Sequence, residues 1–263
     1  MYRSLYYIYT VAKNTTDQNK KVIIQMVNHV IFLIFNIVLY THVYKLIPAL
    51  QEKLPFENAI WSMSIYFIIF ALGLRNLQRA FREDIRSGNI EIYLLRPMNY
   101  IWQKVLVQVG QGTIAFLSAL VLTIIVNVLL VGGPVITMPL WIWIVLMTVL
   151  FLLAQVLTCL LLILCGLSGF WIDDSEPVYF VVSKLIMIFG GAWVPVAFFP
   201  KTLQIIATFS PFGASVATSY MLYPSASWNG FVLILDVLFW IAICWLLTWF
   251  ISKRAFKRLA VNG

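Results

Sequence analysis

The strongest constraint on this chain is a series of apolar stretches, each close to the length that an α-helix needs to cross a bilayer. A spanning helix requires about 20 predominantly apolar residues. Six such stretches lie at roughly 23–47, 59–76, 104–131, 141–167, 178–197 and 229–252. Hydrophobic residues make up 62% of the 263 residues and charged residues only 11%, whereas about a quarter of a water-soluble domain is charged. We therefore expect an all-α integral membrane protein with six transmembrane helices.

The positive charges indicate how such a protein is oriented. Lys and Arg are concentrated before residue 22, between 75 and 104, and after 252, and six spans place all three regions on one side. Only Lys45, Lys53 and Lys201 fall on the other side. The positive-inside rule makes the crowded side cytoplasmic, so we expect a multi-pass protein of a plasma (inner) membrane with both termini in the cytoplasm. Topology and anionic lipid explain the net charge of +8 without a nucleic-acid partner.

The sequence divides into one membrane domain and two short ends. In the N-terminal segment, 1–21, apolar residues recur at helical spacing, which favours a short amphipathic helix in the membrane interface. The alternative is that these residues form the first turns of a long first span. Residues 22–252 form the six-span domain, and 253–263 form a basic cytoplasmic tail.

Between the fifth and sixth spans, residues 198–228 are too apolar for a solvated loop. Pro200, Pro211 and Pro224 interrupt them too often for a full span. We expect a re-entrant pair of short helices on the outer side. Such an arrangement requires protein neighbours that satisfy the broken backbone.

A basic arm follows the second span. Arg75, Arg79, Arg82 and Arg86 are spaced so that they share one helical face, next to an apolar stripe. Gly88 suits the left-handed position that ends a helix. A second short helix then begins near residue 89 and ends before the proline at 97. Its apolar face is expected to contain Ile90, Tyr93 and Leu94.

An acidic cluster, Asp173, Asp174 and Glu176, lies in the next inner loop. We expect this cluster to be solvated, with contact to the basic arm or to a partner as the alternative.

A few polar residues inside the spans are candidates for a transport pathway or an interface: Asp236, Gln108, Gln111 and Asn127. Asp236 is the only carboxylate well inside a span, where charge is costly and often functional. Its apolar helical neighbours favour a structural partner over a cavity-lining role, and coupling-ion chemistry comes third. For the amides, interhelical hydrogen bonds are favoured over substrate contacts.

The sequence offers no site for catalysis. It has no Gly-x-x-x-x-Gly-Lys-Ser/Thr loop for nucleotide phosphates and no Gly-x-Ser-x-Gly motif. His29 and His42 are 13 residues apart without neighbouring carboxylates or cysteines, which argues against zinc. We therefore expect no catalytic residue, no bound metal and no cofactor on this chain.

The segment from Asp84 to Pro97, followed by Lys104, resembles the region between spans two and three of ABC transporter permeases of the type-2 exporter class. In that family a Gly-Thr pair precedes a hydrophobic-Glu pair, a Leu-rich turn, a proline and a Gly-Lys pair that opens the third span. This chain departs from the pattern with Asn89 in place of Thr and Gln103 in place of Gly. The glycine, Phe-Pro and Ser-Pro pairs between residues 190 and 212 also look like that family. They look most like its bacterial branch of multidrug, viologen and antibiotic exporters.

The resemblance implies a permease subunit without ATPase activity of its own. Two permease chains, as a homodimer or a paralogous heterodimer, would form the pathway, and a separate ATP-binding subunit would bind ATP and Mg. Segment 75–104 would carry a cytoplasmic coupling helix that contacts that subunit. The residues implied in coupling are Arg82, Asp84, Arg86, Gly88, Asn89, Ile90, Glu91, Leu94, Leu95 and Pro97.

Other interpretations remain open. The basic segment could face lipid without a protein partner. The chain could also be a secondary transporter or channel, or, less favoured, a membrane-embedded enzyme.

Overall fold

The computed structural model describes residues 19–94, 98–172, 174–223 and 230–262, and these residues form helices and no strands. The expected all-α class is therefore confirmed. The expected N-terminal interfacial helix lies almost entirely outside the described residues. The α-helices are α2 (Asn19–Leu46), α3 (Leu50–Lys53), α4 (Phe56–Ala71), α5 (Arg75–Arg86), α6 (Ile90–Leu94), α7 (Tyr100–Leu130), α8 (Leu140–Leu167), α9 (Glu176–Phe189), α10 (Lys201–Phe209), α11 (Pro211–Ala214) and α12 (Gly230–Asn262). Three 3-10 helices are η1 (Ser168–Phe170), η2 (Val196–Phe198) and η3 (Ala217–Leu222).

Among the described residues, five helical stretches, rather than the six that we expected, are long and apolar enough to cross a membrane. They are Ile23–Leu46, Phe56–Arg86, Tyr100–Leu130, Leu140–Phe170 and Gly230–Phe256. The stretch expected at 178–197 differs because α9 has only 14 residues and ends before Gly190 and Gly191. Two consecutive glycines favour a helix end, and Pro195, four residues after Gly191, is the residue before the next helix, η2.

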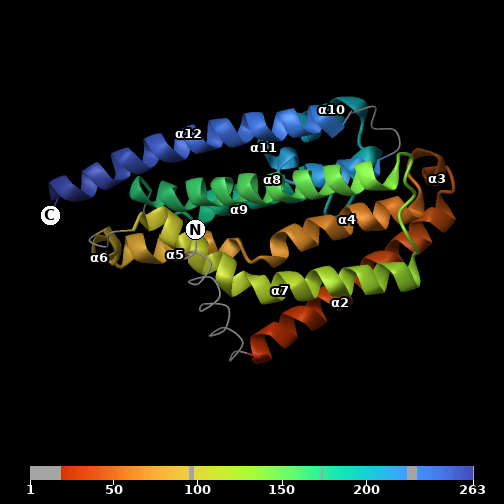
Figure 1. The fold of residues 1–263 in the computed structure, drawn as a ribbon, viewed down its shortest axis with the longest axis horizontal. Coiled ribbons are helices and arrows are strands. Elements are labelled where there is room, and N and C mark those ends of the chain that lie inside the picture. The colour runs from red at the N-terminus through yellow and green to blue at the C-terminus, as the bar shows by residue number, and fades with distance from the viewer. Residues whose placement is uncertain (1–18, 95–97, 173, 224–229, 263) are drawn as a thin grey trace.

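The long helices lie side by side along one common direction, with α6 at one end and α3 at the other (Figure 1). We call these the α6 end and the α3 end. α8 runs between α12 and the α4–α5 pair, and α2 and α7 lie on the other side of α4 (Figure 1). Leu150, Ala154 and Leu157 of α8 are fully buried and form the centre of the largest apolar cluster. In the most apolar windows of α2, α7 and α12 only 22%, 17% and 22% of the residues are buried, which is typical of helices that face lipid or another subunit.

Short helices fill the region between α9 and α12, where a long helix is absent. Their free carbonyl groups accept hydrogen bonds from side chains of neighbouring elements. Tyr220 Oη donates to the carbonyl of Phe189 at 2.6 Å, and Trp240 Nε1 donates to that of Phe209 at 3.0 Å. The amide of Asn58 donates to the carbonyl of Leu222 at 2.8 Å. The protein itself thus satisfies a broken backbone, as an apolar environment requires.

The second span is also interrupted. α4 and α5 are separated at Gly73, whose φ of +72° is unfavourable for any residue with a Cβ atom. The carbonyls freed by this break accept hydrogen bonds from two amides. Gln108 Nε2 of α7 donates to Leu72 at 3.1 Å, and Gln155 Nε2 of α8 donates to Ile69 at 3.2 Å. The basic arm is therefore a separate helix, fixed to its neighbours at its start.

Candidate functional site

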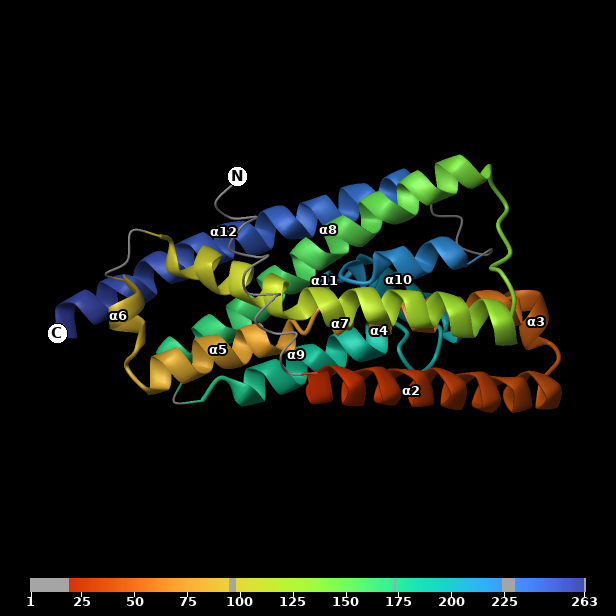
Figure 2. The ribbon, with the colours of Figure 1, turned by 60° about the horizontal axis from the view of Figure 1, so that its bottom comes forward.

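The α5–α6 turn lies at the α6 end of the molecule, where only α12 extends beyond it (Figures 1 and 2). α5 ends at Arg86, and Gly88 follows with a φ of +71°, the left-handed conformation expected for this position. A Cβ atom at Gly88 would meet no other atom within 4 Å, so backbone conformation rather than space favours glycine here. The Asn89 carbonyl accepts from the amides of Ile92 and Tyr93, which starts α6. The predicted stop and short second helix are both present.

Asp84 points into the protein rather than toward a partner. Its side chain is nearly buried, and Oδ2 lies 2.5 Å from Lys104 Nζ of α7. Tyr100 Oη donates to the same oxygen at 2.8 Å. The ammonium of Lys104 also lies 4.2 Å from the centre of the Tyr93 ring of α6. Asp84 and Lys104 thus join the end of α5 to the start of α7, with α6 between them.

Arg82 connects the arm to the loop before α9. Its guanidinium binds Asp174 in a two-point arrangement, with Nε–Oδ1 and Nη2–Oδ2 distances of 2.6 Å each. This geometry matches the planar fork of arginine to a carboxylate and is stronger than a single contact. Arg86 lies 3.6 Å from Asp174, and Arg82 and Arg75 lie 3.6 and 3.8 Å from Glu176.

The acidic cluster is therefore not the solvated loop that we expected. Asp174 and Glu176 contact the basic arm, while Asp173 lies outside the described residues. Asp174 Oδ1 also accepts from the backbone amide of Glu176 at 2.9 Å. The hydrogen bonds from Arg82 and from this amide lower the pKa of Asp174 below its ordinary value. The sequence signal for this contact was the match between four arginines on one face and the only acidic cluster.

We expected Ile90 to lie on the apolar face of α6 that contacts a partner, but its side chain points into the protein. Ile90 is fully buried against Leu77 and Phe81 of α5 and Tyr100 of α7, so it fixes α6 to the protein. Ile92 is exposed, with 59% of its surface accessible. The side chains of Glu91 and Leu94, and residues Leu95 and Pro97 altogether, lie outside the described part of the chain. The coupling role of all these residues stays a prediction.

The four candidate pathway residues do not form one site. Asn127 of α7 is buried and donates to Ser64 Oγ of α4 at 2.9 Å. Gln108 contacts the α4–α5 break, and Gln111 lies beside it in a polar groove between α5 and α7. Asp236 lies on α12, half-buried, and its Oδ2 atom is enclosed without a hydrogen-bond partner in the described structure. Asn127 and Gln108 thus make the interhelical contacts that we favoured for the amides.

In the described part of the chain, no group of three His, Cys, Asp or Glu side chains could bind a metal ion. At the α6 end, Asp84, Asp174 and Glu176 each form an ion pair with a neighbouring Lys or Arg.

Comparison with known proteins gives one clear result. A family model described as ABC-2 family transporter protein matches residues 26–263, which is most of the chain. None of the curated proteins compared with the chain matches it. Because the family match includes every described helix from most of α2 to α12, the chain belongs to the ABC-2 transporter family.

Proposed function

We propose that this chain is the permease subunit of an ATP-driven exporter. Two permease chains, identical or paralogous, form the translocation pathway, and separate ATP-binding subunits bind ATP and Mg and supply the energy. The family and the five candidate spans support a transport role in a membrane. The missing phosphate-binding loop in the sequence fits a subunit that receives its energy from another chain.

The observation that carries this proposal is the construction of the α5–α6 turn. A turn that transmits movement from a partner must not move independently of the spans behind it. Here the Asp84–Lys104 pair fixes the turn to α7, and Arg82–Asp174 fixes α5 to the loop before α9. Ile90 is buried among apolar side chains of α5 and α7. Ile92 is exposed, so it can form an apolar contact with a partner, beside Asn89.

The path of the chain supports a sixth crossing made in pieces. α9 begins beside Arg82 at the α6 end, whereas Gly230 at the start of α12 lies beside Leu146 near the α3 end. Residues between these points therefore lead from one end of the protein to the other. We assign α9 and the short helices after it to this crossing, with residues 198–228 as the outer re-entrant region.

The proposed orientation follows from the distribution of charge. The α6 end carries the basic arm and the basic part of α12, so we place it, with both termini, in the cytoplasm of a bacterial inner membrane. The resemblance to multidrug exporters suggests an amphipathic cargo, which agrees with the apolar spans.

The test is ATP turnover in the assembled complex. The chain is co-purified with an ATP-binding subunit encoded beside it, and transport substrate is added. Ile92→Asp places a charge on the exposed face of α6 and is expected to remove permease-stimulated ATP turnover. Ile92→Val, the matched control, keeps the apolar contact and should retain it, and both variants should insert normally into membranes.

Two results would contradict the proposal. Unchanged stimulation in Ile92→Asp would mean that α6 does not contact the ATPase. Transport by the chain with no ATP-binding subunit present would instead favour a secondary transporter, in which Asp236 would be the first residue to test.

A further inference from the structure

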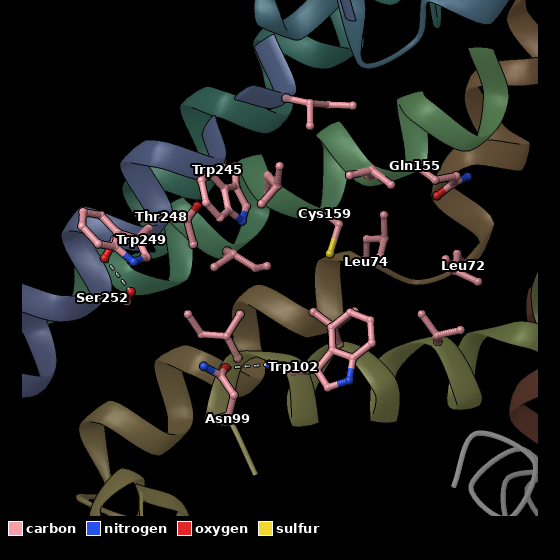
Figure 3. A pocket seen from close by; sticks show the side chains of 17 residues that line it. Leu72, Leu74, Asn99, Trp102, Gln155, Cys159, Trp245, Thr248, Trp249 and Ser252 are labelled. Atoms are coloured by element: carbon pink, nitrogen blue, oxygen red, sulfur yellow. Dashed lines mark hydrogen bonds between the residues drawn. The ribbon is translucent and has the colours of Figure 1, made fainter. Parts of the chain in front are cut away.

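A large apolar pocket opens on the side of the protein between α7, α8 and α12 (Figure 3). Its volume is about 580 Å³, within the ~300–1,000 Å³ that small-molecule sites occupy. Its lining is mainly aliphatic and aromatic, and no carboxylate or other charged side chain takes part. The residues of the α5–α6 turn do not contribute to it, so it is separate from the proposed coupling site.

The pocket has the depth of one membrane leaflet. Along α12 it extends from Ile241 to Ser252, which corresponds to about 16 Å at 1.5 Å per residue. The hydrocarbon core of a bilayer is about 30 Å thick, so this length is about half of it. At the deep end lie Leu72 and Gln155, beside the break between α4 and α5.

The part of the pocket nearest the α6 end contains residue types that are common at a membrane interface. Trp102 of α7 faces Trp245 and Trp249 of α12 across the pocket, and Asn99 and Ser252 lie at the same end (Figure 3). Tryptophans favour the boundary between hydrocarbon and head groups. Lys253, directly after Ser252, is exposed, and its Nζ lies 3.9 Å from the centre of the Trp249 ring. The ammonium group of Lys253 therefore lies next to an aromatic side chain that lines the pocket.

We propose that this pocket binds one acyl chain of an anionic phospholipid from the leaflet at the α6 end, with the lipid phosphate beside Lys253. The apolar lining suits a hydrocarbon chain, and the cation of Lys253 suits a negatively charged head group.

The test is native mass spectrometry of the full-length protein released from bilayers of equal parts phosphatidylglycerol and phosphatidylethanolamine. We expect wild-type protein to retain one phosphatidylglycerol in preference to phosphatidylethanolamine. Lys253→Glu should lower phosphatidylglycerol retention at least about fivefold, since one basic residue near an anionic lipid contributes about that factor. Lys184→Glu is the matched control, because Lys184 is also exposed beside an aromatic ring, at 5.5 Å from Phe180, but lies outside the pocket.

A second pair of variants tests the pocket itself. Val156 lines the pocket, whereas Leu152 lies one turn earlier on α8 and does not, and both are exposed. Val156→Trp should fill the pocket and abolish retention of the lipid, and Leu152→Trp should leave it unchanged. Equal retention of the two lipids, or equal loss in both tryptophan variants, would overturn the proposal.

A third measurement does not depend on how well the variants fold. Phosphatidylglycerol with brominated acyl chains, added at low mole fraction to the wild-type protein, should quench tryptophan fluorescence more strongly than brominated phosphatidylethanolamine. Equal quenching by the two lipids would contradict the preference. Specific cross-links between two copies across the α7–α12 face, with no retained lipid, would show a subunit interface there and would also overturn the proposal.

Discussion

At the scale of single residues, the charged groups at the α6 end fall into a buried pair and a more exposed network. Asp84 and Lys104 are almost enclosed, with only 11% and 12% of their side chains accessible, whereas Arg82 and Asp174 keep 26% and 36% accessible. A buried ion pair adds little to stability over apolar residues, but leaving one charge without its partner is costly. The two sets should therefore respond differently to substitution.

For the buried pair, Lys104→Met is expected to destabilise the protein by about 3–5 kcal/mol, because Asp84 then carries a charge without compensation. The double variant Asp84→Asn, Lys104→Met removes both charges and should lose less than the sum of the two single variants. Thermal unfolding in detergent micelles measures both quantities. Strict additivity would show that the two side chains do not interact.

For the exposed network, the contribution of Asp174 should depend on pH. Its pKa in the folded protein is lowered from the ordinary value of 3.8, mainly by Arg82, so its stabilising effect is present above pH 3.8 and is lost as the pH falls through the lower, folded-state pKa. Asp174→Asn should thus have a lower melting temperature than wild type near neutral pH, and the difference should vanish in acid. A difference that is constant with pH would exclude an electrostatic origin.

Sequence reasoning offered the contact between the basic arm and the acidic cluster as an alternative, but it did not predict the Asp84–Lys104 pair. The resemblance singled out Asp84 and Lys104 separately. These residues are 20 positions apart, and they pair because the chain reverses its direction at α6, between α5 and α7. The inward direction of Ile90 likewise depends on the packing of α5 against α7, since a five-residue helix is too short for periodicity to separate its faces.

At the scale of elements, specific contacts stabilise the breaks between helices as well as the helices themselves. The α4–α5 break combines a left-handed glycine with amides from α7 and α8. The sequence predicted that the basic arm follows the second span and did not indicate a break at Gly73, because an isolated glycine in an apolar run is tolerated in a helix. The amides that satisfy the freed carbonyls are distant in sequence, so nothing local in the sequence indicated the break.

The close approach of α7 to this break can be tested at Gly112. A Cβ atom at this position would lie 1.9 Å from the carbonyl oxygen of Leu72, which is backbone and cannot rotate away. Gly112→Ala should therefore shift α7 and destabilise the protein by about 1–3 kcal/mol, as overpacked cores do. Gly133→Ala, where a Cβ atom meets nothing within 4 Å, is the control and should change the melting temperature little. Equal effects of the two would mean that α7 does not pack on the break.

The short α9 was the main error of the sequence prediction among the helices. The apolar stretch at 178–197 has the composition of a span, but composition alone does not show that the helix ends at Gly190 and Gly191. The prediction of short helices after residue 198 was more informative, because prolines fix helix starts at α10 and α11.

At the scale of the whole molecule, the long helices, their order and the class of the fold could be predicted because a bilayer demands long apolar segments. The lateral pocket could not, since its lining comes from three helices and from the α4–α5 break. The sequence also leaves orientation as an inference from charge, and this inference can be tested directly.

The two ends of the protein should differ in their access to a membrane-impermeant thiol reagent. Ser87 at the α5–α6 turn and Gln51 of α3 at the opposite end are both exposed, and the native cysteines, Cys159, Cys165 and Cys244, lie within candidate spans. Because basic residues favour the cytoplasmic side, Gln51→Cys should be labelled in intact cells. Ser87→Cys should be labelled only after the membrane is permeabilised. The wild-type protein measures background labelling of the native cysteines. The reverse pattern would place the α6 end outside the cell, where no ATP-binding subunit could reach it, and would contradict both the orientation and the proposed coupling.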